Sequence, residues 1–98
     1  MKANELQQKI ADGEKMRVLD CRESEEVAAK DSGIPGAENI PMGQVFVEVG
    51  KGTIAKDEKT VVVCAKGGRC EIVAEELREK GFNIEHLEGG LEAWEELN

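Results

Sequence analysis

One cysteine, Cys64, lies in a sequence context that could support nucleophilic chemistry. It directly follows residues 60–63, a β-branched run (TVVV) typical of a buried parallel strand. The turn after it combines adjacent glycines with basic residues: Ala65, Lys66, Gly67, Gly68 and Arg69. In such a glycine-rich turn, successive backbone N–H groups can point inward and form an anion-binding concavity. The N-terminus of the helix that follows would add partial positive charge to this concavity.

A thiol held in that concavity is expected to ionise more readily than free cysteine, because the thiolate is the favoured occupant. Lys66 and Arg69 would add two cationic side chains, so no histidine base is needed. The alternative is that Cys64 is only a small buried hydrophobe at the end of a strand. The glycines and the arginine that follow Cys64 favour the chemical interpretation.

The elements that must position Cys64 alternate between helical and extended patterns. Apolar spacing and turn residues predict helices over 4–12, 44–49, 70–80 and 91–97, and a further helix capped by Ser24. Strands are predicted over 16–21, 60–64 and 84–87, with a short extended piece at 39–40. This alternation predicts an α/β fold of three layers, with a central parallel sheet flanked by helices on both faces. In open sheets of this kind, ligands bind beyond the carboxyl ends of the strands, where Cys64 is expected.

Length and charge narrow the classes of function. The chain has 98 residues, which suits one domain, here predicted over residues 1–98. A net charge of −8 repels phosphate backbones and anionic lipid, so we expect no nucleic-acid or membrane partner. The acidic residues Glu23, Glu25 and Glu26 are interpreted as the solvated face of a helix. We expect a monomer, because no exposed apolar stripe demands a partner.

Cysteine usage and hydropathy indicate the compartment. Three cysteines, an odd number, argue against a disulfide framework in a chain large enough to fold without one. No apolar run has the length of a signal peptide or a membrane span. We therefore expect a reducing, cytoplasmic location.

Four segments of the chain together resemble signatures of the rhodanese-homology domain family. They are residues 18–23 (VLDCRE), 34–41 (IPGAENIP), 62–69 (VVCAKGGR) and 87–94 (LEGGLEAW). The third places four residues between a cysteine and an arginine, which is similar to the active-site loop of that family. The segments follow the family's order and extend over nearly the whole chain. The resemblance implies a rhodanese-like fold.

The resemblance also implies sulfurtransferase activity with Cys64 as the nucleophile. The thiolate would take the outer sulfur of thiosulfate, a polysulfide or a related donor and hold it as a persulfide. A thiol, cyanide or a partner protein's cysteine would then remove that sulfur. By resemblance, the backbone of residues 65–69 cradles the sulfur, while Lys66 and Arg69 favour an anionic donor. No metal or organic cofactor is implied, and paired zinc-ligand spacing such as C-x-x-C is missing from the sequence.

Three positions depart from the family pattern. Gly33 stands where a histidine is common. Ala65 stands where many members have arginine, which weakens the positive rim expected to attract thiosulfate. Cys70 stands where a small hydroxyl residue is frequent. The remaining cysteine, Cys21, falls in a predicted buried strand and is interpreted as core.

Cys70 admits two interpretations. It begins an apolar stripe that Val73, Ala74 and Leu77 continue along one helix face. It could instead act as a resolving thiol that converts a Cys64 persulfide into an intraloop disulfide and releases sulfide. We favour the core interpretation here, because a resolving thiol must be accessible and cysteine is usually buried.

Two other functions remain open. Cysteine-dependent phosphatases and arsenate reductases of similar architecture typically have five residues between the cysteine and the arginine, whereas here there are four. A shorter loop should cradle one sulfur better than a tetrahedral oxyanion. The chain could also be a persulfide relay module, which accepts sulfur from one protein and passes it to another with little turnover of small donors.

Overall fold

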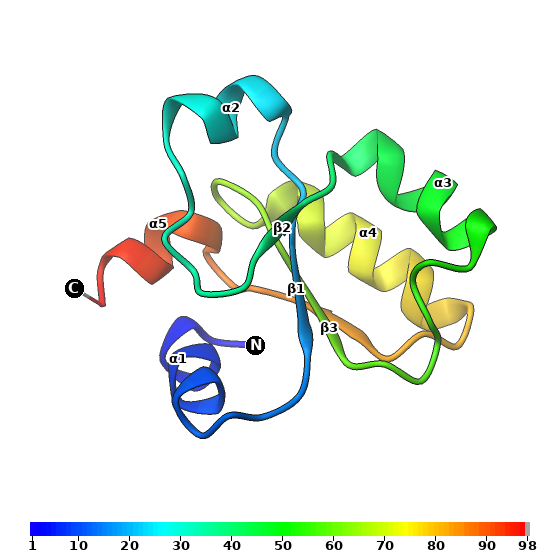
Figure 1. The fold of residues 1–98 in the computed structure, drawn as a ribbon, viewed down its shortest axis with the longest axis horizontal. Helices are drawn as coiled ribbons and strands as arrows, with labels where there is room; N and C mark the ends of the chain where they lie inside the picture. Colours follow the sequence, from blue (N-terminus) through cyan, green and yellow to red (C-terminus); the bar gives the residue numbers. More distant parts are fainter. Residues whose placement is uncertain (98) are drawn as a thin grey trace.

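The computed structural model describes residues 1–97, whose strands form a four-stranded sheet. The strands are β1 (Arg17–Asp20), β2 (Glu38–Asn39), β3 (Thr60–Val63) and β4 (Ile84–His86). They lie in the order β2-β1-β3-β4, and each neighbouring pair is parallel (Figure 1). Strand β3 therefore lies between β1 and β4, so its carboxyl end opens near the middle of one edge of the sheet.

Helices cover both faces of this sheet. They are α1 (Ala3–Ala11), α2 (Ser24–Ala29), α3 (Met42–Lys51), α4 (Gly68–Glu79) and α5 (Gly90–Glu95). Helices α3 and α4 lie on one side, α1 and α5 on the other, and α2 lies beyond the carboxyl end of β1 (Figure 1). The predicted three-layer α/β fold with a parallel sheet is confirmed.

Alternate residues of β3 face opposite helical layers. Val62 packs in the cluster that includes α3 and α4, whereas Val61 and Val63 pack in the cluster that includes α1 and α5. Burial on both faces explains why the β-branched run is continuous instead of alternating with polar residues. The apolar stripe of α4 is also confirmed, and its buried members are Cys70, Val73, Ala74 and Leu77.

Helix α3 is longer than the sequence predicted. The expected segment was residues 44–49, followed by a loop, but the helix extends to Lys51. Val45 is buried and Val49 packs against the same core cluster, so tertiary burial outweighs the low helix propensity of valine. Gly52, with φ +80°, then ends the helix in the left-handed conformation.

The ends of three other helices also differ from prediction. Helix α4 begins at Gly68, so Gly68 and Arg69 belong to its first turn and not to the preceding loop. Ser24 was expected to cap α2, but Glu23 occupies the N-cap position. The Glu26 carboxylate accepts the Glu23 backbone N–H at 3.0 Å, so the helix end needs no serine hydroxyl. Helix α5 ends at Glu95, two residues before the predicted end.

None of the helices in residues 1–97 has both the length and the apolar character needed to cross a membrane.

Candidate active site

Cys64 directly follows β3 and lies at the carboxyl edge of the sheet, as predicted. Its side chain is 1% exposed, and its Sγ accepts the backbone N–H of Gly67 at 3.1 Å. A pocket of about 340 Å³ opens over it, lined by Cys64, Ala65, Lys66, Gly68 and Arg69. The structure thus brings the predicted nucleophile and the predicted loop together around one small hollow.

Two contacts with α5 hold the loop in the orientation that aims N–H groups at the sulfur. The backbone N–H of Leu91 donates to the Cys64 carbonyl at 2.7 Å, and that of Glu92 donates to the Ala65 carbonyl at 3.2 Å. With these carbonyls directed to α5, the Gly67 N–H is free to turn toward Sγ. Gly67 makes this turn with φ +99° and serves as the N-cap of α4. The N-terminus of α5 therefore supports the loop that precedes α4.

Gly90 is a site residue that sequence reasoning missed. A Cβ at this position would lie 2.4 Å from the Cys64 carbonyl oxygen and 2.7 Å from the Gly67 nitrogen. Only glycine allows this approach between the α5 start and the nucleophile loop. The sequence did contain a signal, the Gly89-Gly90 pair, which lies in one of the four segments that resemble the family. That Gly90 lies against Cys64 and Gly67 is shown only by the folded structure.

Cys70 is a core residue, as favoured from the sequence, and it is also a direct neighbour of Cys64. It is fully buried in the core, yet its Sγ lies 3.2 Å from the Sγ of Cys64. It also lies 3.3 Å from the carbonyl oxygen of Gly67, to which its thiol can donate. A thiol has one proton, so Cys70 can donate to Gly67 or to Cys64, but not to both simultaneously. When Cys64 is a thiolate, the proton is most strongly attracted to the charged sulfur.

These contacts shift the two thiols in opposite directions. The pKa of Cys64 is lowered, to about 5, chiefly by the hydrogen bond from the Cys70 thiol. Backbone N–H groups of Cys70, Gly67 and Arg69 lower this pKa further, and together they outweigh the effect of burial. The pKa of Cys70 is raised, because its thiol hydrogen-bonds to Cys64 and is itself desolvated. Cys64 is therefore the thiolate of the pair and Cys70 its proton donor.

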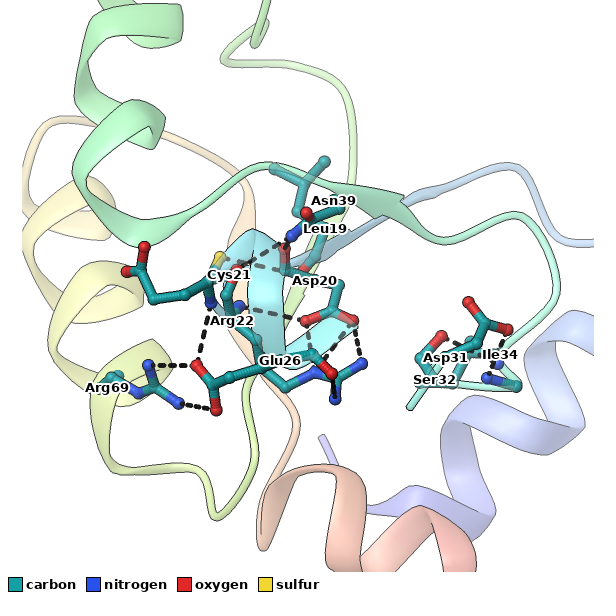
Figure 2. Close-up of polar contacts among 12 residues, drawn as sticks. Leu19, Asp20, Cys21, Arg22, Glu26, Asp31, Ser32, Ile34, Asn39 and Arg69 are labelled. Atoms are coloured by element: carbon teal, nitrogen blue, oxygen red, sulfur yellow. Dashed lines mark hydrogen bonds and ion pairs between the residues drawn. The ribbon is translucent and has the colours of Figure 1, made fainter. Parts of the chain in front are cut away.

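Arg69 does not extend freely into the pocket. Its guanidinium forms two bonds to the Glu26 carboxylate, at 3.1 and 3.3 Å (Figure 2). The same Glu26 oxygen that accepts one of these bonds also accepts the backbone N–H of Glu23. Glu26 is partly solvent-exposed in the first turn of α2, as expected, but nothing in the sequence indicated its ion pair with Arg69. Its charge offsets that of Arg69, which leaves exposed Lys66 as the other cationic side chain lining the pocket.

A buried ion pair fixes the segment that presents Glu26. Asp20 and Arg22 are 3% and 4% exposed, and Arg22 Nη2 donates to Asp20 Oδ2 at 2.8 Å (Figure 2). Arg22 Nε adds bonds of 3.0 and 3.2 Å to the two Asp20 oxygens. The Asn39 side-chain amide donates to the carbonyls of Asp20 and Arg22. The chain is thereby locked just before α2 begins.

Cys21 and His86 do not line the pocket. Cys21 is buried in the core as expected, and burial raises its pKa to about 12. His86 is a partly exposed residue of β4. Within residues 1–97, no three His, Cys, Asp or Glu side chains form a group that could hold a metal ion.

Comparison with known proteins agrees with this geometry. The chain is 39% identical over 90 residues to the Bacillus subtilis (strain 168) protein named "Putative sulfurtransferase YtwF", a match covering 92% of this chain and 84% of that protein. It is 29% identical over 90 residues to "Putative sulfur carrier protein YrkF" of the same organism, covering 91% of this chain and 46% of that protein.

A solved structure and a family profile give the same result. A rhodanese-related protein from Thermoplasma volcanium superposes with a TM-score of 0.84 at 31% sequence identity, covering 100% of this chain and 91% of that chain. Residues 2–97 match the profile of the rhodanese-like domain. The cysteine loop, the parallel sheet beneath it and these matches lead to one conclusion: the chain belongs to the rhodanese-like domain family.

Proposed function

We propose that this chain is a sulfurtransferase that moves a sulfane sulfur from a donor to a nucleophilic acceptor through a Cys64 persulfide. The observation that carries the proposal is the position of Cys64 Sγ, which accepts the Gly67 N–H at 3.1 Å and faces the pocket. A thiolate with a lowered pKa in this position is ionised at neutral pH and is available as a nucleophile. The relative named as a sulfurtransferase supports the same activity.

In the first half-reaction, the Cys64 thiolate attacks the outer sulfur of thiosulfate or the terminal sulfane sulfur of a polysulfide. A new S–S bond forms to Cys64 while the donor's own S–S bond breaks. The electron pair of the broken bond leaves with sulfite, or with the shortened polysulfide. Cys64 is left as a persulfide anion whose outer sulfur occupies the pocket lined by residues 65, 66, 68 and 69.

In the second half-reaction, an acceptor nucleophile attacks the outer sulfur. A thiolate, cyanide or a partner protein's cysteine takes the sulfur, and the electron pair of the persulfide bond returns to Cys64. The thiolate is then stabilised again by the Cys70 thiol and the loop N–H groups. Two successive displacements at one residue predict ping-pong kinetics.

A second candidate function, a persulfide relay between proteins, has its own support. Glu26 offsets the charge of Arg69, Ala65 contributes no charge to the rim, and the whole chain has a net charge of −8. This combination attracts a small dianion such as thiosulfate only weakly. The relative named as a sulfur carrier is consistent with delivery of sulfur by a protein donor.

Intact-mass spectrometry after brief exposure to thiosulfate or polysulfide tests the proposal. Wild type should gain one sulfur, about 32 Da, and release one equivalent of sulfite when thiosulfate is the donor. Cys64→Ala should do neither, whereas Cys21→Ala, which alters a buried cysteine outside the pocket, should behave as wild type. Loading by polysulfide alone would favour the relay. No sulfur gain and no released sulfite with either donor would overturn the proposal.

A further inference from the structure

The two sulfur atoms of the site lie in direct contact. Cys64 Sγ and Cys70 Sγ are 3.2 Å apart, at the end of β3 and on the first turn of α4. A disulfide bond is about 2 Å long, so closing it needs a movement of only about 1 Å. Cys21, the third cysteine, has its Sγ directed at the Leu19 carbonyl, 3.7 Å away. Cys70 is therefore the thiol placed to react with Cys64.

Cys64 borders both the pocket and the core cluster that contains Cys70. Cys64 lines the pocket, but Cys70 does not, and Cys70 is fully buried in the core cluster with Val73 and Leu77. A sulfur added to Cys64 would extend into the pocket, whereas Cys70 contacts Cys64 Sγ from the core. Displacement at sulfur needs the attacking and departing atoms on opposite sides of the atom attacked. An approach of Cys70 from the core, with the added sulfur leaving toward the pocket, would meet this requirement.

We infer that Cys70 discharges the Cys64 persulfide as sulfide and forms a Cys64–Cys70 disulfide. The inference rests on the proposed function, because it needs sulfur to be loaded on Cys64 first. The chain would then perform two reactions with loaded sulfur: transfer to an acceptor when one is present, and reductive release when none is.

The step balances without an external oxidant. Cys70 loses its proton to solvent, the outer sulfur takes a proton from solvent in the pocket, and Cys70 Sγ attacks Cys64 Sγ. The Sγ–Sγ bond forms, the bond to the outer sulfur breaks, and its electron pair leaves with that sulfur as HS⁻. The outer sulfur is reduced to sulfide while the two cysteines are oxidised to a disulfide. Two thiols or one dithiol from outside, attacking Cys64 from the pocket side, then return both cysteines to the reduced state.

The electrostatics of the pair keep Cys70 inactive until sulfur is loaded. While Cys64 is a thiolate, Cys70 donates its proton to it, and this bond and burial raise the pKa of Cys70. When Cys64 carries an extra sulfur, the negative charge moves to the outer atom, farther from Cys70. The strongest reason for Cys70 to retain its proton is then weakened. Loading itself therefore converts the hydrogen-bond donor into the attacking group.

A comparison of wild type with Cys70→Ser and Cys70→Ala tests this inference. Serine keeps a hydrogen-bond donor beside Cys64 but cannot form the disulfide, and alanine provides a second variant if serine disturbs folding. Cys21→Ala is the matched control. Each reduced protein receives a pulse of polysulfide, is desalted anaerobically into buffer without acceptor, and is followed by non-reducing intact mass and by trapping of released sulfide. Trypsin cleaves after Lys66 and Arg69, so a Cys64–Cys70 disulfide joins two separate peptides.

Wild type and Cys21→Ala should pass from a mass about 32 Da above the reduced protein to one about 2 Da below it. One sulfide per chain and the linked peptide pair should accompany this change. Cys70→Ser should keep its added sulfur. Its rate of sulfide release should be lower than that of wild type by a factor on the order of ten or more. Equal rates of sulfide release in wild type and both Cys70 variants, or a wild type that keeps its added sulfur, would overturn this inference but not the proposed function. If neither wild type nor the Cys70 variants ever load sulfur or release sulfide, the proposed function fails with it.

Discussion

Two neighbouring strands of the sheet end in a buried cysteine, and the two thiols have opposite properties. Cys21 follows β1 and Cys64 follows β3. Burial raises the pKa of Cys21 to about 12, whereas the pKa of Cys64 is lowered despite similar burial. Position at the end of a parallel strand is therefore not sufficient to activate a cysteine.

The difference comes from what each sulfur contacts. Cys21 Sγ lies 3.7 Å from the Leu19 carbonyl oxygen, and the negative charges of Cys64 and Asp20 add to the effect of burial in disfavouring its thiolate. Cys64 Sγ instead receives the Gly67 N–H and the Cys70 thiol proton. Burial disfavours the thiolate of both cysteines, but only Cys64 has hydrogen-bond donors whose effect exceeds that of burial. The cysteine after β1 is therefore a core residue, and the cysteine after β3 is the one we propose for the chemistry.

The largest expected effect is the contrast in reactivity between these two thiols. At neutral pH, iodoacetamide should modify Cys64 at least about a thousandfold faster than Cys21, because Cys64 is ionised and Cys21 is not. Cys64 is ionised above its lowered pKa, so its rate should fall only when the pH is lowered below the range of ordinary thiols. Peptide mass spectrometry of briefly alkylated protein measures both rates. In urea, where the fold is lost, the two cysteines should be alkylated at similar rates. Equal alkylation rates in the folded protein would contradict the proposed difference between the two thiols.

The structural role of the β1 end can be tested by breaking its ion pair. Arg22→Leu leaves the Asp20 carboxylate buried without its partner, which should lower the free energy of unfolding by about 3–4 kcal/mol. Urea denaturation measures the loss, and Asp20→Asn in the same chain should recover part of it. Unchanged stability combined with a lost sulfurtransferase reaction would instead assign Asp20 and Arg22 to chemistry.

A substitution at the contact between α5 and the nucleophile loop should lower the free energy of unfolding almost as much as Arg22→Leu. Gly90→Ala places a Cβ against Cys64 and Gly67 and should destabilise the fold by about 3 kcal/mol, through overpacking and a strained positive φ. Gly81→Ala is the matched control, since Gly81 also has a positive φ but no atom near the added Cβ. It should cost only about 1 kcal/mol. Similar losses measured by urea denaturation for the two variants would show that the close approach at Gly90 is unimportant.

The smallest expected effect concerns the charge over the pocket. Glu26→Gln removes the carboxylate that holds Arg69, so KM for thiosulfate should fall roughly threefold at low salt, and less at high salt. Glu25→Gln changes the charge by the same amount on the same helix and should leave KM nearly unchanged. Steady-state kinetics of both variants provide the measurement. A rise in KM for Glu26→Gln would mean that the ion pair positions Arg69 for the donor instead of withholding it.

Much of the fold and of the nucleophile's position could be predicted from local sequence. The run of residues 60–63 predicts a strand covered on both faces, and the glycine pair after Cys64 predicts a turn with inward N–H groups. The spacing from Cys70 to Leu77 predicts the buried face of α4. These features succeed because strand, turn and helix propensities act over a few neighbouring residues.

Tertiary structure decided the features that depend on partners distant in the chain. The pairing of Arg69 with Glu26 has no local signal, and the Gly89-Gly90 pair does not identify Cys64 as its neighbour, because each contact depends on how α2 and α5 pack around the loop. The sequence allows Cys70 to lie near Cys64, but it favours a core role for Cys70, because a resolving thiol is expected to be accessible and cysteine is usually buried. The sequence by itself determined that a cysteine ends the central strand before an anion-binding turn. Only the folded chain decided which donors reach that sulfur, because hydrogen bonds depend on atomic positions that helix packing sets.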